Sequence, residues 1–240
     1  TSIRYRLPVS DMLKQNLPVT VSLSAMSLAI TIAAAAPLSI YLAKNNGKKR
    51  AVFLSALSQI GVAVPPFWLG VLLILGFAVF LRILPSGDFI PFSVSPAGAL
   101  RSLILPAAAI SAGTTAVVVR YLKNALLDQF GLDYVRTAKS KGMTQNKILY
   151  KHVLKNALLP TVTIMGMIVS DILGGSIIVE NVFNLPGIGK LLISGVGHRD
   201  FVLVQGLTFY MALTVIVINL FVDLLCMAID PRVSFRKSGT

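Results

Sequence analysis

The sequence predicts an all-α membrane protein with five transmembrane helices. Hydrophobic residues make up 55% of the chain and charged residues 13%, whereas soluble domains average about 25% charged residues. The charges are gathered in short stretches that separate long apolar runs, which is typical of multispanning membrane proteins. The apolar runs match the roughly 20 residues that a helix needs to cross a bilayer. We therefore expect one transmembrane domain over residues 17–230.

The start of the chain predicts an outer juxtamembrane segment, a span and a basic loop. Residues 1–16 are mixed and basic, and Ser10 can cap a short surface helix. No charge occurs from residue 15 to residue 43, which predicts a first span at 17–43. Residues 44–50 (KNNGKKR) then form a tight basic loop.

The middle of the chain predicts two more spans, with a proline break in one of them. A second span is expected at residues 52–81, where Pro65 and Pro66 remove two backbone donors and force a kink. Residues 82–101 are rich in Pro, Gly and Ser and indicate an ordered loop. A third span is expected at residues 102–121, where small residues allow close helix packing.

The C-terminal part of the chain predicts the last two spans, at residues 157–179 and 203–229. The fourth span carries one charge, Asp171, and a turn-rich outer loop separates it from the fifth span. Residues 231–240 form a basic tail.

The distribution of basic residues predicts the orientation, because cytoplasmic loops of membrane proteins are enriched in Lys and Arg. The loops on one side of the spans, with the tail, hold 15 of the 22 Lys and Arg residues, and the other side holds 7. We expect the richer side in the cytoplasm, together with the C-terminus. Thr1 is then outside the membrane, so we expect a further helix before this sequence.

The composition argues against several other functions. The net charge of +13 is explained by cytoplasmic loops, so we expect no nucleic-acid partner. Cys226 is the one cysteine, and His152 and His198 lie in different segments, so we expect no metal site. The sequence has no Gly-rich phosphate-binding loop followed by Lys and Ser or Thr, so we expect no ATP hydrolysis by this chain.

The most elaborate polar segment, residues 123–156, predicts two short helices that meet at a glycine. Asp133 can begin the first helix, and Gly142 falls where a left-handed residue would end it. Thr144 can cap the second helix, and Pro160 marks the entry to the fourth span. This shape suits docking on a partner at the membrane surface. A solvated basic loop that binds anionic lipid is the alternative.

This segment resembles the EAA loop of permease subunits of bacterial ATP-binding-cassette (ABC) importers. The runs DYVRTAKSKG at residues 133–142 and HVLKNALLP at residues 152–160 look like the branch that moves dipeptides, oligopeptides or nickel. Ala138 and Gly142 match the general pattern, whereas Arg136 stands where that pattern has Glu.

The resemblance extends over the whole chain, in order and spacing. Matching runs are VPPFWLG at residues 64–70, VENVF at 179–183, PGIG at 186–189 and DPR at 230–232. The resemblance implies a set of residues that couple the chain to an ATPase: Asp133, Tyr134, Arg136, Ala138, Lys141, Gly142, His152, Leu154 and Pro160. Four of them are expected as surface contacts of a coupling helix: Asp133, Tyr134, Arg136 and Ala138.

The resemblance implies a permease subunit that forms half of a translocation pathway for small peptides or nickel in the inner membrane of a bacterium. The implied partners are a second permease subunit, two ATPase subunits and an extracytoplasmic substrate-binding protein. ATP and Mg²⁺ would bind to the ATPase subunits, and this chain would bind no cofactor and catalyse no reaction. The loop around Gly142 would be a coupling helix seated in a groove of the ATPase subunit.

Two groups of residues are candidates for the pathway or its outer gate. Asp171 is an ionisable residue within a span, and such residues usually face a cavity or a partner. We expect it to line the pathway or to bond to a neighbouring helix. Glu180, with the turn that contains Pro186, Gly187 and Gly189, is expected at an outer gate or at a docking surface for the binding protein.

A secondary transporter or channel is the main alternative, with Asp171 and Asp223 as ion-coupling groups. It predicts uptake driven by a proton or sodium gradient, and inverted repeats that the sequence does not show. An intramembrane enzyme would need a catalytic pair, and the two aspartates are predicted at unequal depths.

Overall fold

The structure of the chain is a computed structural model that describes residues 1–87 and 89–229, and within these residues it contains helices and no strand. This confirms the predicted all-α fold. The basic tail at residues 231–240 lies outside the described residues. The helices are α1 (Val9–Lys44), α2 (Lys49–Ala63), α3 (Pro66–Leu73), α4 (Pro96–Phe130), α5 (Asp133–Ser140), α6 (Gln145–Ile148), α7 (Leu154–Val182), α8 (Ile188–Gly197) and α9 (Phe201–Ile229), with π-helical turns at Ile74–Phe80 and Leu149–Val153.

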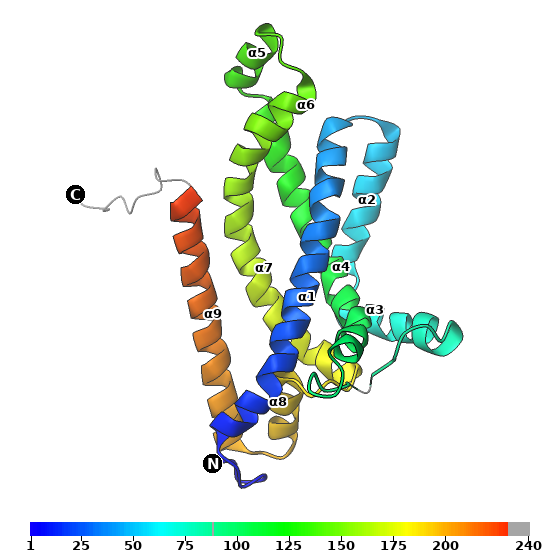
Figure 1. The fold of residues 1–240 in the computed structure, drawn as a ribbon, viewed down its shortest axis with the longest axis vertical. Helices are drawn as coiled ribbons and strands as arrows, with labels where there is room; N and C mark the ends of the chain where they lie inside the picture. The colour runs from blue at the N-terminus through cyan, green and yellow to red at the C-terminus, as the bar shows by residue number, and fades with distance from the viewer. Residues whose placement is uncertain (88, 230–240) are drawn as a thin grey trace, which may run out of the picture.

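Helices α1 and α4 pack along most of their length and, with α7, form the centre of the bundle (Figure 1). Small residues of α1 at helical spacing lie buried in this interface: Ser27, Thr31, Ala35 and Ser39. The hydroxyls of Ser27, Thr31 and Ser39 donate to carbonyls one turn earlier in α1. The hydroxyl oxygens of Thr31 and Thr114 lie 2.7 Å apart. Small side chains let the two backbones approach closely, as in other membrane helix pairs.

Helix α1 is longer than the sequence predicts. It begins at Val9 and includes Pro18, so the expected surface helix capped by Ser10 is instead the first turn of α1. The residue at the cap position is Pro8, and no side chain caps this end. The prediction was wrong here because a proline can be accommodated within a transmembrane helix when neighbouring groups satisfy the backbone.

Helix α4 also exceeds its predicted bounds. It starts at Pro96, where Ser95 accepts a hydrogen bond from the Gly98 amide at 3.1 Å, and it continues through Pro106 to Phe130. Part of the loop expected at residues 82–101 is therefore helical. A Ser cap followed by Pro at the first helical position is a standard helix start.

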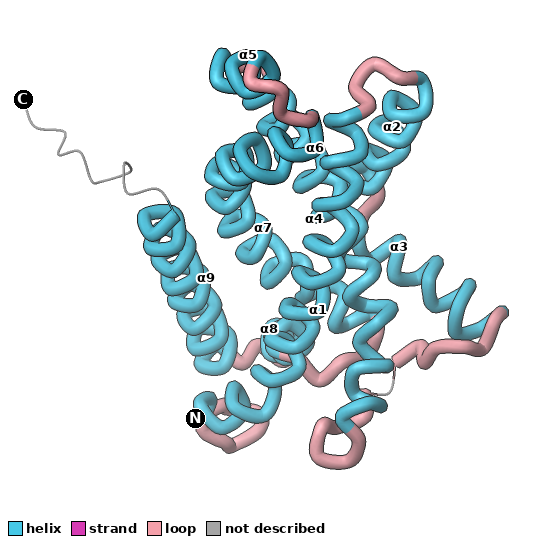
Figure 2. The backbone as a smooth tube through the Cα atoms, turned by 45° about the horizontal axis from the view of Figure 1, so that its top comes forward, coloured by secondary structure: helices cyan, strands magenta, loops and turns pink. Residues whose placement is uncertain are grey.

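The second predicted span, residues 52–81, is broken at the two prolines as expected. The chain bends by 101° between helix α2 and the arm Pro66–Phe80, so this segment is a bent pair of helices and not a straight helix. The arm runs away from the bundle in both views (Figures 1 and 2). Four other described helices are long and apolar enough to cross a membrane, and the bent pair would make a fifth.

The two ends of the bundle separate the loops as the charge pattern predicts. The basic loop after α1 and the segment around α5 and α6 lie at one end, where Lys44 Nζ is 5.1 Å from the centre of the Tyr150 ring. The N-terminal residues, α8 and the start of α9 lie together at the opposite end.

Candidate functional site

Helix α5 covers the end of α4 and the start of the α6–α7 helix (Figure 1). Val135 and Ala138 are its buried residues, and they belong to one apolar cluster with Leu122, Leu126, Ile148, Leu149, Val153 and Ala157. This cluster fixes α5 to the bundle. A displacement of α5 would therefore be transmitted to α4 and α7.

The opposite face of α5 is polar and exposed. The side chains of Asp133 and Arg136 are 95% and 82% exposed, and their closest charged atoms are 3.8 Å apart. A pair this exposed contributes little to stability. Thr137 in α5 and Lys141 directly after it are also exposed. This face offers both charges to a partner.

Two of the four residues expected as surface contacts face inward instead. Ala138 is buried, and Tyr134 is half-buried with its hydroxyl donating to Gln129 Oε1 at 2.9 Å. The surface expectation was wrong for this pair, because Ala138 is three residues from the buried Val135 and four from Tyr134, so that both border the buried side of the helix. Tyr134 and Ala138 anchor α5, while Asp133 and Arg136 are available for contact.

Gly142 ends α5 in a left-handed conformation, as predicted, with φ of +76°. The amide of Met143 donates to the carbonyl of Ala138 at 3.2 Å, five residues back, which is the hydrogen bond of a glycine-terminated helix end. A Cβ built on Gly142 would meet no atom within 4 Å. The glycine is therefore required by its backbone angles and not by crowding.

The second part of the predicted segment begins one long helical rod. Helix α6, the π-helical turn and α7 follow one another without a break from Gln145 to Val182, and α7 curves along its length (Figure 1). Thr144 precedes the rod, but its side chain makes no capping hydrogen bond, contrary to the prediction.

The three remaining coupling candidates lie along this rod. His152 is half-buried in the π-helical turn, and Leu154 packs against the apolar cluster beneath α5. Pro160 lies inside α7, and it is the first residue of the part of this helix that is apolar enough to cross a membrane, as predicted. It borders a cavity of about 220 Å³ between α4 and α7.

The two aspartates in the spans are both exposed and are not brought together. Val222 on α9 lies against Gly166 on α7, so Asp223 is level with that part of α7. Asp171 is five residues further along α7, which is about 7.5 Å toward the end where α8 lies. This agrees with the expected difference in depth between the two aspartates.

Glu180 lies near the C-terminal end of α7 and is fully buried. Oε1 accepts a hydrogen bond from the Thr20 hydroxyl of α1 at 2.8 Å, and Oε2 accepts from the amides of Gly189 and Lys190 at 2.7 and 3.2 Å. The Ile188 amide donates to the Thr20 oxygen at 2.9 Å. One carboxylate thus joins α1, α7 and the first turn of α8.

The glycines of the predicted outer turn make room for this carboxylate. A Cβ on Gly187 would lie 2.3 Å from Glu180 Cδ, and a Cβ on Gly189 would lie 2.4 Å from Ile177 Cα. Pro186 is exposed in the turn. Glu180 is buried, so it offers no docking surface to a binding protein in this conformation. A gate at this turn stays a prediction.

A second carboxylate at this end of the bundle, Asp200, directly precedes α9. It accepts hydrogen bonds from the Ser2 hydroxyl and from the amides of Arg4 and Leu203, the last two at 3.1 Å. These bonds, led by the one from Ser2, hold the pKa of Asp200 at about 2, below the usual value of 3.8. The N-terminal residues are thereby tied to the start of α9.

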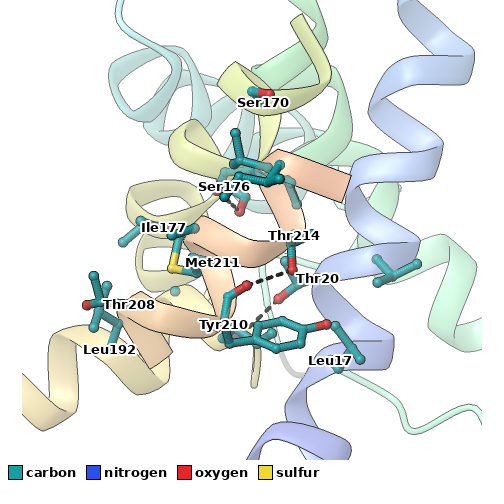
Figure 3. Close-up of a pocket in the computed structure, with 17 residues that line it drawn as sticks. Leu17, Thr20, Ser170, Ser176, Ile177, Leu192, Thr208, Tyr210, Met211 and Thr214 are labelled. Atoms are coloured by element: carbon teal, nitrogen blue, oxygen red, sulfur yellow. Dashed lines mark hydrogen bonds between the residues drawn. The ribbon is translucent and has the colours of Figure 1, made fainter. Parts of the chain in front are cut away.

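A cavity of about 540 Å³ lies beside the Glu180 site, between α1, α7, α8 and α9. Figure 3 shows Leu17 and Thr20 of α1 together with Tyr210 and Met211 of α9 around it. Its walls are mostly apolar, and hydroxyls such as that of Thr214 are bonded to carbonyls of their own helix. Neither Thr20 nor this cavity was predicted, because nothing local in the sequence marks contacts between helices so distant in the chain.

The chain is similar to known membrane transport proteins over nearly its whole length. The family model described as binding-protein-dependent transport system inner membrane component matches residues 35–235. A putative peptide transport system permease protein of Brucella suis is 37% identical over 228 residues, which cover 95% of this chain and 73% of that protein. The oligopeptide transport system permease protein AppB of Bacillus subtilis is 34% identical over 97% of this chain and 74% of that protein.

The fold is also found in a solved structure. A chain of the MetNI methionine ABC transporter in an inward-facing conformation matches 92% of this chain and 98% of its own length, with a TM-score of 0.76 and 18% sequence identity. At this identity the match shows a shared fold. Taken with the family model and the permease relatives, it shows that the chain belongs to the family of inner membrane components of binding-protein-dependent transport systems.

Proposed function

We propose that the chain is the permease subunit of an ABC importer for small peptides. The observation that carries the proposal is helix α5, which presents the exposed charges of Asp133 and Arg136 while its buried face is fixed to the α7 rod. The names of the relatives, which are peptide, oligopeptide and dipeptide permeases, support peptides as the cargo.

The chain would work as one part of a larger complex. A second permease subunit would complete the pathway, and an extracytoplasmic binding protein would deliver the peptide. Two ATPase subunits would bind ATP and Mg²⁺ and carry out hydrolysis, so this chain would be non-catalytic. The location would be a bacterial inner membrane with the C-terminus in the cytoplasm, which agrees with the excess of Lys and Arg around α5.

The coupling would be mechanical. When the ATPase subunits close on ATP, they would move α5 through its exposed face. Val135 and Ala138 would transmit this movement to the cluster that contains Leu149 and Val153, and so to α7. Gly142 lets the chain reverse after α5 and enter the rod without a strained residue.

Asp171 would line the translocation pathway. It lies on an exposed row of α7 with Thr163, Met167 and Ile178, and an ionisable side chain facing lipid in the middle of a span is costly. A pathway or a partner therefore covers this row in the complex. Full uptake in both Asp171→Asn and Asp171→Leu would contradict a role for this carboxylate in transport.

Site-specific photocrosslinking tests the proposed ATPase contact. A photoreactive amino acid would replace Thr137 on the exposed face of α5, or Val52 on α2 as a control that is 59% exposed near the same end of the bundle. We expect the probe at Thr137 to form a crosslink to the ATPase subunit in isolated membranes and the probe at Val52 to form none. Capture from Val52 but not from Thr137 would contradict the proposal.

A further inference from the structure

The outer end of the chain contains a buried joint that the proposed coupling does not explain. In this joint, Glu180 of α7 accepts hydrogen bonds from the Thr20 hydroxyl of α1 and from the amides of Gly189 and Lys190 at the start of α8. Among the described residues, no Lys or Arg side chain lies within ion-pair distance of this carboxylate. Hydroxyl and amide donors alone surround the carboxylate, at the positive end of the α8 dipole.

The joint is too closely packed for α8 to shift independently of α7. The space beside the carboxylate is filled by Gly187 and Gly189, where even a methyl group would overlap Glu180 or the backbone of Ile177. Ile188 and Leu185 next to them are buried. Interiors packed this closely transmit displacement from one element to the next.

The other end of the same rod lies beneath α5. The rod is unbroken from Gln145 to Val182, and its first residues pack against Val135 and Ala138. The cytoplasmic helix α5 and the outer helix α8 are therefore held at opposite ends of one element. Helix α8 also forms part of the wall of the large cavity, through Ile188, Gly189 and Leu192.

We propose that Glu180 is a positioning residue that makes α8 move with α7, so that movement of α5 changes the wall of the outer cavity. This inference rests on the proposed function, because it takes the movement of α5 to come from ATPase subunits. Glu180 touches no cargo in this scheme. It acts through the hydrogen bonds that join Thr20 and α8 to α7.

The test measures how many peptides are imported per ATP hydrolysed by the complete transporter in proteoliposomes. Thr20→Val removes the hydroxyl that donates to Glu180, Thr20→Ser keeps a hydroxyl, and Glu180→Gln keeps the volume but replaces one acceptor by a donor. We expect the ratio to fall about fivefold or more in Thr20→Val and Glu180→Gln, and to stay near the wild-type value in Thr20→Ser.

Asp200→Asn is the matched control. Asp200 is also a buried outer carboxylate that accepts amide and hydroxyl donors, but it lies outside the rod, so its variant should keep the wild-type ratio. Wild-type ratios in both Thr20→Val and Glu180→Gln would overturn the inference, as would an equal fall in Asp200→Asn. The wild-type transporter's own ATP-driven import tests the proposed function separately.

A second measurement does not depend on transport. In a Cys226→Ser background, an environment-sensitive fluorophore on Val196→Cys would report on α8, since Val196 is 60% exposed. We expect its emission to change when ATP is added to the complete transporter, and the change to be lost with Thr20→Val. If Thr20→Val leaves the ATP-dependent change in emission unchanged, the inference that this contact makes α8 move with α7 is overturned.

Discussion

The Thr20 hydroxyl donates a hydrogen bond of 2.8 Å to Glu180 Oε1, and the two residues are 160 positions apart. This contact joins α1 and α7 at the end of the bundle where α8 lies. The Ile188 amide completes it by donating to the Thr20 oxygen. Together with the bonds from the Gly189 and Lys190 amides to Glu180, this pair fixes the place of α8, next to the larger of the two cavities described above.

Replacing Gly142 by Val should reduce peptide uptake about tenfold, because a left-handed backbone costs a β-branched residue roughly 1–3 kcal/mol. Gly142→Asn should retain most of the uptake, since Asn tolerates this conformation. Gly47→Val is the matched control, with φ of +85° and the same open surroundings in the loop after α1. Equal losses in both Val variants would show that backbone strain, and not the position in the coupling loop, causes the effect.

Ala138→Leu should detach α5 from the bundle, because extra methyl groups in a packed cluster cost on the order of 1–3 kcal/mol. Co-purification of the ATPase subunits should decrease. Thr137→Leu places the same side chain on the exposed neighbouring position and should leave α5 in place. Protease sensitivity of the α5 segment in detergent distinguishes the two variants, and equal sensitivity would contradict the inward orientation of Ala138.

Gly189→Ala should lower the thermal stability of the purified chain. Its Cβ would lie 2.4 Å from Ile177 Cα, which forces backbone displacement at a cost of about 1–3 kcal/mol. Gly197→Ala, at the other end of α8, meets no atom within 4 Å and should be neutral or slightly stabilising. Melting followed by tryptophan fluorescence compares the two, and an unchanged Gly189→Ala melting temperature would contradict the packing.

Asp200→Asn should lower the melting temperature at pH 7, because the ionised carboxylate accepts three hydrogen bonds in the folded chain. The folded pKa of Asp200, about 2, is below the usual 3.8. Its contribution is therefore complete above pH 3.8 and is lost as the pH falls through 2. The melting difference between wild type and variant should be the same at pH 7 and pH 5. A difference that disappears by pH 5 would contradict this assignment.

The sequence was sufficient for the all-α class and for the long apolar helices, because hydropathy and proline position act locally. It did not predict α8, which lies in the region expected to be a turn-rich loop. It predicted the break at Pro65 and Pro66 but not the 101° bend, which depends on what the two arms pack against. It placed the ends of α1 and α4 too far inward, since Pro18 is accommodated inside α1 and Pro96 begins α4 within the stretch expected to be a loop.

The site was predictable in the same uneven way. Gly142 could be assigned because a glycine after a short helix has a local meaning, and the structure confirms its left-handed conformation. The inward orientation of Tyr134 and the burial of Glu180 depend on helices distant in the sequence. Thr20 carries no local signal at all, so its contact with Glu180 becomes visible only in the folded chain.

The most direct test of the central proposal is import of a radiolabelled dipeptide or oligopeptide into vesicles that contain this chain with its second permease, ATPase and binding-protein partners. The account predicts import that requires ATP hydrolysis and the binding protein and that persists when an ionophore removes the proton and sodium gradients. Import driven by either gradient in the absence of ATP would contradict it and would support a secondary transporter that uses Asp171 and Asp223.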